Sequence, residues 1–146
     1  MAILTAERIQ LHAAPQSKEE AIRLVGELLV RDGCVAPEYV EGMLAREKIM
    51  STYLGNGVAI PHGQFENREH IYRSGISVVQ VPQGVEWEPG EKAYLIVGIA
   101  ATSDEHVAVL ANLAEAIEDE SVVQEMVQTD DPEVILRILN AEPQDV

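Results

Sequence analysis

Residues 93–120 read AYLIVGIAATSDEHVAVLANLAEAIEDE, and this stretch predicts a strand that leads directly into a helix. The run from Ala93 to Ala101 is continuously apolar and rich in Ile, Leu and Val, which is typical of a buried strand. Ser103 can cap the helix that follows. That helix should carry one apolar face, formed by Val107, Leu110, Ala114 and Ile117. A buried strand followed by an amphipathic helix is a basic unit of layered α/β proteins.

Two helices are predicted upstream of this unit. In SKEEAIRLVGELLVRDG, Ser17 and Glu20 have the spacing of a capping box, apolar residues recur at helical intervals, and Gly33 ends the pattern. A second helix should open at Pro37, a favoured first-turn residue, and run to about Lys48.

Short runs of β-branched residues supply the other strands, VAI, GISVVQV and, at an edge, IQLHA. Two short helices should follow Ser121 and the pair Asp131-Pro132. Helices before, between and after strands predict an α/β layered fold in which helices cover a largely buried sheet.

Composition restricts the possible functions. The chain has 146 residues, which fits one domain spanning residues 1–146. A formal charge of −15 opposes binding to nucleic acid and to acidic membranes, and favours basic protein partners. Cys34 is the single cysteine, so no internal disulfide forms. With no signal peptide or membrane-spanning run, we expect a cytoplasmic protein.

His62 is the first candidate for chemistry, and it lies in GNGVAIPHG (residues 55–63). Pro61 biases the residue before it towards an extended conformation, and Gly63 lets the backbone turn or approach another group closely. A strand followed by proline, histidine and glycine is a rigid support for an exposed imidazole. GNG alone is a turn, and without the lysine of a phosphate-binding loop we expect no nucleotide or other cofactor.

His106 is the second candidate, because it falls in the first turn of the helix after the 93–101 strand. Free N–H groups and the helix dipole favour an anion there. Ligands gather at the carboxyl ends of strands in open α/β sheets, so His62 and His106 could face one crevice. His106 could instead cap its own helix. His12 and His70 are better explained by surface or structural roles.

Two further alternatives concern charged residues near these histidines. A zinc site of a metallohydrolase, built from His62, His106 and Asp104 or Glu105, lacks any HxxxH or CxxC spacing, so we expect no metal. Arg46 could simply pair with Glu47 or Glu41 on a solvated helix face.

Two segments together resemble a known family. REKIMSTYLGNGVAIPHG (Arg46 to Gly63) and the 93–120 stretch are similar to the mannitol-type enzyme IIA domain of the phosphotransferase system, over about residues 9–139. The first segment is a motif of the wider mannitol, fructose and nitrogen-regulatory IIA group, and GIAA…DEH indicates the mannitol branch. The resemblance implies an α/β fold with a mixed sheet flanked by helices.

The resemblance also implies a function and roles for three residues. His62 matches the residue that takes a phosphoryl group from the phosphocarrier HPr and passes it to a cysteine of the cognate IIB domain. His106 matches the second active-site histidine, and Arg46 the arginine associated with the site. The sequence therefore predicts a phosphoryl carrier for mannitol uptake, with a nitrogen-type regulatory IIA protein as the alternative.

Overall fold

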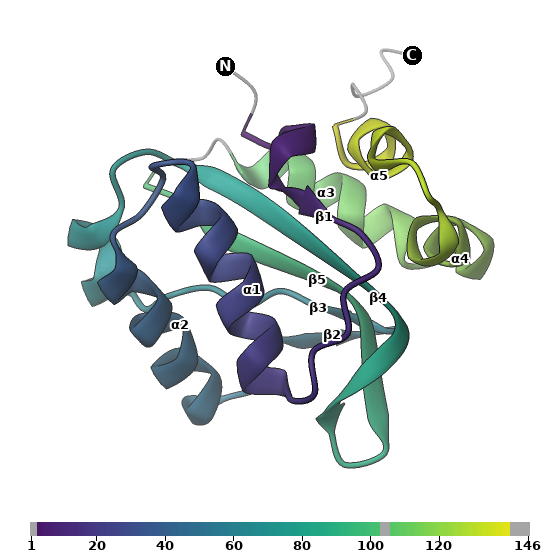
Figure 1. The fold of residues 1–146 in the computed structure, drawn as a ribbon, viewed down its shortest axis with the longest axis horizontal. Helices are drawn as coiled ribbons and strands as arrows, with labels where there is room; N and C mark the ends of the chain where they lie inside the picture. Colours follow the sequence, from purple (N-terminus) through teal and green to yellow (C-terminus); the bar gives the residue numbers. More distant parts are fainter. Residues whose placement is uncertain (1–2, 103–105, 141–146) are drawn as a thin grey trace.

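The computed structural model describes residues 3–102 and 106–140. Within them a five-stranded sheet has helices on both faces (Figure 1). The elements are η1 (Ala6–Arg8), β1 (Ile9–Gln10), α1 (Lys18–Arg31), α2 (Pro37–Ile49), β2 (Tyr53–Gly55), β3 (Val58–Ala59), η2 (Phe65–His70), β4 (Gly75–Glu88), β5 (Glu91–Ala100), α3 (Val107–Ala116), α4 (Glu120–Gln128) and α5 (Pro132–Leu139).

The sheet is mixed, as the resemblance implied. Its strand order is β1-β4-β5-β3-β2. The pairs β1·β4 and β3·β5 are parallel, whereas β4·β5 and β2·β3 are antiparallel. The long hairpin of β4 and β5 forms the centre, and β3 lies beside β5 with Val58 opposite Leu95. The predicted α/β layered class, a mixed sheet flanked by helices, is confirmed.

Local signals set the limits of the first two helices. The Ser17 side chain accepts a hydrogen bond from the Glu20 N–H at 3.1 Å, so Ser17 is the N-cap of α1. Gly33, just beyond the C-cap of α1, has a φ of +75°, which glycine adopts without strain. Pro37 begins α2 as predicted. These boundaries agree with the sequence because the residues that make them are neighbours in the chain.

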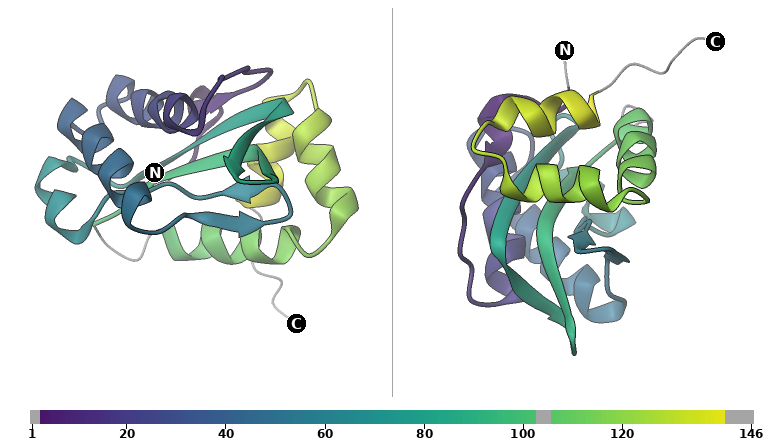
Figure 2. Two further views of the ribbon diagram at one scale, coloured as in Figure 1. Left: turned by 90° about the horizontal axis from the view of Figure 1, so that it is seen from below. Right: turned by 90° about the vertical axis from the view of Figure 1, so that its right-hand side faces the viewer.

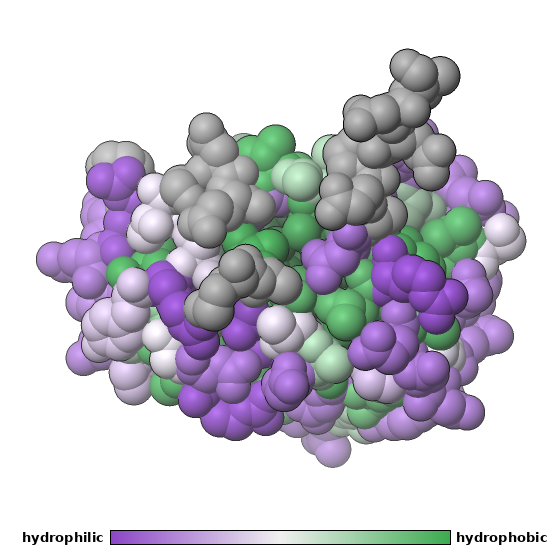
Figure 3. Space-filling model, turned by 90° about the horizontal axis from the view of Figure 1, so that it is seen from above, coloured by the Kyte–Doolittle hydropathy of each residue, from purple (hydrophilic) through white to green (hydrophobic). Residues whose placement is uncertain are grey.

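Two apolar layers lie on opposite faces of the sheet, one under α1 and α2 and the other under α3, α4 and α5 (Figures 1 and 2). Alternation along the central strands divides their side chains between the layers, because successive residues of a strand point to opposite faces. Seen from above, hydrophobic surface shows in the middle of a largely hydrophilic face (Figure 3). On the α1 side lie Val79, Val81 and Ile96, and on the α3 side Ile76, Val78, Leu95 and Val97.

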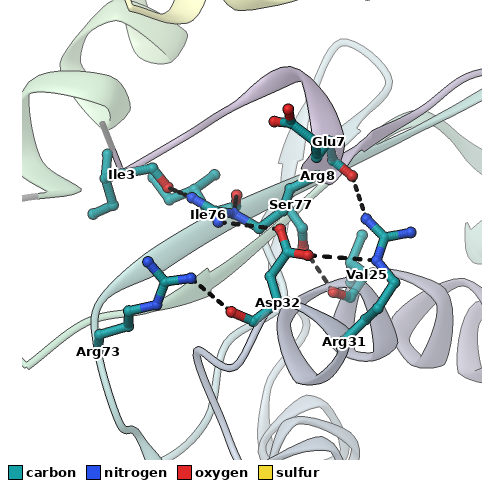
Figure 4. A network of polar contacts seen from close by, with 9 residues as sticks. All are labelled: Ile3, Glu7, Arg8, Val25, Arg31, Asp32, Arg73, Ile76 and Ser77. Atoms are coloured by element: carbon teal, nitrogen blue, oxygen red, sulfur yellow. Dashed lines mark hydrogen bonds and ion pairs between the residues drawn. The ribbon is translucent and has the colours of Figure 1, made fainter. Parts of the chain in front are cut away.

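A buried arginine joins the N-terminal segment to the sheet (Figure 4). Arg8 is 3% exposed, and its guanidinium donates to the carbonyls of Ile76 at 3.1 Å and Ile3 at 2.8 Å. It also pairs with Asp32 at 3.3 Å. Arg73 donates to the Asp32 carbonyl at 2.6 Å. The charge of Arg8 is thus compensated in the interior, as a buried charge requires.

The structure differs from the prediction in two elements. The strand β2 was not expected, because it is three residues long and has no apolar alternation of its own. The predicted apolar face of the helix after β5 is only half right. Leu110 and Ile117 are partly buried against the core, but Val107 (54% exposed) and Ala114 face outwards, and the fully buried residues are Val109, Leu113 and Ala116. This helix is apolar almost all round, so periodicity alone does not select the buried face. The predicted cap Ser103 lies outside the described residues.

Candidate active site

The candidate site lies where β3 and β5 end, side by side. Beyond β3, His62 forms a single parallel bridge with Ile99 of β5, and the Ile99 N–H donates to the Pro61 carbonyl at 3.1 Å. The parallel pairing of β3 and β5 therefore continues as far as His62. This brings His62 to the carboxyl edge of the sheet, the region where open α/β sheets bind ligands.

The ring of His62 is half-buried and held in one orientation. Its Nδ1 lies 2.8 Å from the carbonyl oxygen of Ile60. A carbonyl oxygen only accepts hydrogen bonds, so Nδ1 must carry a proton in this contact. In the neutral ring Nε2 is then the nitrogen with the free lone pair, and hence the nucleophilic one.

His62 and His106 line one pocket of about 320 Å³. The guanidinium-bearing Arg68 lines it as well. Apolar residues from four different segments form much of the remaining wall: Ile60, Ile71, Ile99, Ala101 and Leu110. The pocket combines two imidazoles and a cation with an apolar wall, which suits the binding of an anionic group.

His106 occupies the N-cap position of α3, immediately before the first helical turn. Its φ and ψ are −80° and −14°, and its side chain makes no capping hydrogen bond. The His106 side chain therefore does not cap its own helix in this structure. The N-terminal end of a helix, with its free N–H groups and positive dipole end, adds a favourable environment for an anion at the His106 side of the pocket.

Arg46 does not line this pocket in the structure. It lies in the last turn of α2, where its Nη1 donates to the Met50 carbonyl at 2.6 Å. The alternative pairings with Glu41 and Glu47 are not formed either: Glu41 pairs with Arg23 at 3.0 Å, and the Glu47 carboxylate accepts hydrogen bonds elsewhere. The structure thus brings together two of the three predicted site residues.

Among the pocket residues that were not predicted from the sequence, Arg68 and Tyr39 carry the groups that matter most for the site. Arg68 lies in η2, two positions before His70, and η2 brings this segment to the pocket. Tyr39 lies in α2, is buried, lines the pocket and accepts a hydrogen bond from the N–H of Gly63. Burial raises the pKa of the Tyr39 hydroxyl above its ordinary value, with the Gly63 N–H acting in the opposite direction. A basic residue close after the histidine was the only signal for Arg68, and none existed for Tyr39.

His12 and His70 lie away from the pocket lining, in keeping with the surface or structural roles expected of them. His12 Nε2 is 2.9 Å from an Asp130 oxygen, and His70 Nε2 is 3.9 Å from Glu69. In the described part of the chain no three His, Cys, Asp or Glu side chains are grouped as metal ligands. The carboxylates of the zinc alternative, at positions 104 and 105, lie outside the described residues.

Membrane-spanning segments were sought among the helices of residues 3–102 and 106–140. None of these helices is both long enough and apolar enough to span a bilayer.

Comparison with known proteins gives full-length matches. The mannitol-specific phosphotransferase enzyme IIA component of Geobacillus stearothermophilus is 41% identical over 140 residues, covering 96% of this chain and 97% of that protein. The crystal structure of mannitol IIA from Escherichia coli is 42% identical, with a TM-score of 0.84, 92% of this chain covered and 97% of the other. A complex of Escherichia coli enzyme IIA and phosphorylated enzyme IIB for mannitol gives 40% identity, a TM-score of 0.88, and coverage of 97% and 100%.

Other relatives are much longer than this chain. The chain spans 17% of a multiphosphoryl transfer protein from Xanthomonas campestris and 23% of a mannitol-specific EIICBA component from Pasteurella multocida. The family model for the phosphoenolpyruvate-dependent sugar phosphotransferase system, EIIA 2, matches residues 2–142. Since this match takes in nearly the whole chain, including both histidines of the pocket, the chain belongs to the EIIA 2 family of the phosphoenolpyruvate-dependent sugar phosphotransferase system.

Proposed function

We propose that this protein carries a phosphoryl group on His62 Nε2, accepting it from phosphorylated HPr and passing it to a cysteine of a IIB domain for mannitol uptake. In the first step the P–N bond of the phosphorylated donor breaks as a P–Nε2 bond forms. In the second step that bond breaks as the cysteine thiolate sulfur takes the phosphoryl group. The family match supports the reaction class, and the pocket geometry supports the atom.

The contact between His62 Nδ1 and the Ile60 carbonyl is the observation on which this proposal chiefly rests. It holds the proton on Nδ1 and so directs nucleophilic attack to Nε2. When Nε2 is phosphorylated, the ring becomes cationic in character and its Nδ1–H becomes a stronger donor. The same carbonyl then stabilises the phosphorylated ring, which allows a reactive intermediate to persist until its acceptor arrives.

Positive charge near the phosphoryl group is needed, because a chain of formal charge −15 repels a dianion at long range. One arginine at about 4 Å is worth about 4 kcal/mol per unit charge at an effective dielectric of 20, before desolvation. Arg68 lines the pocket and is suited to this role. Arg46 keeps the role implied by the family, on condition that its guanidinium leaves the Met50 carbonyl. His106 would donate a hydrogen bond to the phosphoryl oxygens or to the His62 ring.

Mannitol and the two protein partners come from the relatives. The Geobacillus protein that matches end to end is named for mannitol, and the Escherichia coli complex pairs mannitol IIA with phosphorylated IIB. The apolar wall around the two histidines suits successive transient contacts with two proteins. The regulatory alternative, a nitrogen-type IIA protein, would share the phosphorylated histidine but not the transfer to a mannitol IIB.

Phosphorylation itself is tested with phosphoenolpyruvate, enzyme I and HPr, followed by intact-mass analysis before and after mild acid. The wild type should gain one acid-labile phosphoryl group, His62→Ala none, and His12→Ala, a matched exposed histidine, the full amount. Nitrogen-15 NMR of the phosphorylated ring should assign the phosphoryl group to Nε2. Full acid-labile phosphorylation of His62→Ala would overturn the proposal.

Transfer to the acceptor separates the two candidate functions. Purified phosphorylated protein is mixed with the IIB domain of a mannitol permease, and loss of the phosphoryl group is followed by mass. Rapid transfer to the IIB cysteine is expected, and a cysteine-to-serine variant of IIB should receive none. Phosphorylation by HPr without transfer to this IIB would favour the regulatory alternative.

A further inference from the structure

A tyrosine hydroxyl connects the residue after His62 to the end of β5. Tyr39 is 3% exposed, and its hydroxyl donates to the Ile99 carbonyl at 2.8 Å. The same oxygen accepts a hydrogen bond from the Gly63 N–H at 2.9 Å. The side chain of Tyr39 in α2 therefore links the two paired segments next to the His62–Ile99 bridge, one through the Gly63 N–H and the other through the Ile99 carbonyl.

Gly63 is packed directly against this tyrosine. A Cβ added at Gly63 would lie 2.6 Å from Tyr39 Cε1 and 2.8 Å from Cζ, closer than real Cβ contacts come. Glycine at this position is thus explained by a close approach of backbone and ring, one of the two explanations that the sequence left open. Just beyond, the chain leaves the edge of the sheet for η2, so the Gly63 contact defines the direction in which the chain leaves His62.

His62 is consequently held from both sides. On the N-terminal side, the Pro61 carbonyl accepts a hydrogen bond from the Ile99 N–H, and the Nδ1 of His62 is hydrogen-bonded to the Ile60 carbonyl. After it, the bond from the Gly63 N–H to Tyr39 is the neighbouring restraint. The first two interactions do not involve Tyr39, so substitution of Tyr39 removes only the restraint that follows His62.

We propose that Tyr39 is a positioning residue for phosphoryl transfer, which holds the His62 ring at the angle needed for in-line attack; this rests on the function proposed above. The hydroxyl has one proton, and that proton is used on the Ile99 carbonyl. Tyr39 therefore acts through the placement of His62. A tyrosine hydroxyl ordinarily has a pKa of about 10 and so keeps its proton at neutral pH. Burial raises the pKa of Tyr39 further in the same direction.

The chain contains a matched control for this hydroxyl. Tyr53, in β2, also donates to a carbonyl, that of Lys92 at 3.1 Å, and also accepts from a glycine N–H, that of Gly57 at 3.1 Å. Tyr53 does not line the pocket of His62. Tyr39→Phe and Tyr53→Phe thus each remove a hydroxyl that donates to a carbonyl and accepts from a glycine N–H, at the site in one case and away from it in the other.

The experiment measures both half-reactions by rapid quench for wild type, Tyr39→Phe and Tyr53→Phe. Misplacement of a reacting group by about 1 Å can cost about a hundredfold in rate, so Tyr39→Phe should transfer roughly tenfold to a hundredfold more slowly in both directions. Its KM for HPr should stay within about twofold of wild type, since the variant loses orientation and no partner contact. Tyr53→Phe should transfer at the wild-type rate.

A second variant covers the case in which Tyr39→Phe does not fold. Gly63→Ala keeps the hydroxyl but forces the ring and the backbone apart, and it should also lower kcat with little change in KM. Equal transfer rates for Tyr39→Phe and Tyr53→Phe, or a wild-type rate for Gly63→Ala, would overturn the role of Tyr39. Failure of the wild type to become phosphorylated would instead overturn the proposed function, so the two failures are distinguishable.

Discussion

Glu47 is a buried carboxylate, and its removal should greatly lower the free energy of unfolding of this protein. It lies near the end of α2 and is 5% exposed. One oxygen accepts from the Thr52 N–H at 2.9 Å and from the Trp87 Nε1–H at 3.0 Å, and the other accepts from the Thr52 hydroxyl at 2.6 Å. The Thr52 carbonyl in turn accepts from the Ile60 N–H at 3.0 Å, on the segment that leads to His62.

The magnitude follows from the donors that Glu47→Ala leaves behind. Three buried donors, the N–H groups of Thr52 and Trp87 and the Thr52 hydroxyl, lose their acceptor, and each such loss costs about 1–3 kcal/mol. We expect a decrease in the free energy of unfolding of about 3–9 kcal/mol, a large part of the 5–15 kcal/mol that is typical of a domain. Glu47→Gln keeps an acceptor oxygen for both N–H groups and should cost less than about half as much.

Urea unfolding followed by far-UV circular dichroism measures this difference, because the fluorescence of Trp87 would respond to the substitution itself. The control is Glu41→Ala on the same helix, where the Glu41 side chain is 67% exposed and pairs with Arg23 at 3.0 Å. Such a surface pair is worth at most about 1 kcal/mol. If Glu47→Ala had the same urea midpoint as Glu41→Ala, the carboxylate would not be the link between α2, β2 and β4 that we infer.

Three further predictions concern the site. His106→Ala and His106→Asn should both slow transfer to IIB roughly tenfold to a hundredfold in rapid-quench assays, since a bond to a charged group is worth about 1.5–3 kcal/mol; a wild-type rate for the Asn variant would exclude a donor role. Arg68→Met should slow phosphorylation by HPr more than Arg46→Met, because of these two arginines only Arg68 lines the pocket before phosphorylation. The Tm should change little in either variant. Unchanged rates in both would mean that neither guanidinium stabilises the phosphoryl group. Because the pKa of Tyr39 is raised, the folded state keeps a proton that the unfolded state loses above about pH 10. The free energy of unfolding should therefore fall as the pH rises beyond that value, and it should fall less steeply in Tyr39→Phe. Urea midpoints measured up to about pH 11 test this.

Much of the fold could be predicted because its signals are local. Ser17 caps α1 through the N–H of Glu20, three positions away, and Gly33 ends the helix through its own φ. Pro37 starts α2 by its ring geometry alone. The strand, the proline and the glycine that support His62 are likewise adjacent to it in the sequence. In each case the interacting groups are neighbours in the chain, so the sequence displays them together.

Apart from His106, which the sequence already placed near His62, the groups that meet around His62 were decided by the tertiary structure alone. The hydroxyl of Tyr39 and the N–H of Gly63 are 24 positions apart, and Tyr39 and the Ile99 carbonyl are 60 apart. The choice between Arg46 and Arg68 as the cation of the pocket depends on how α2 ends and how η2 returns to the sheet edge. Residues so distant in the chain meet only when the helices pack on the sheet, and no pattern in either segment encodes its distant partner.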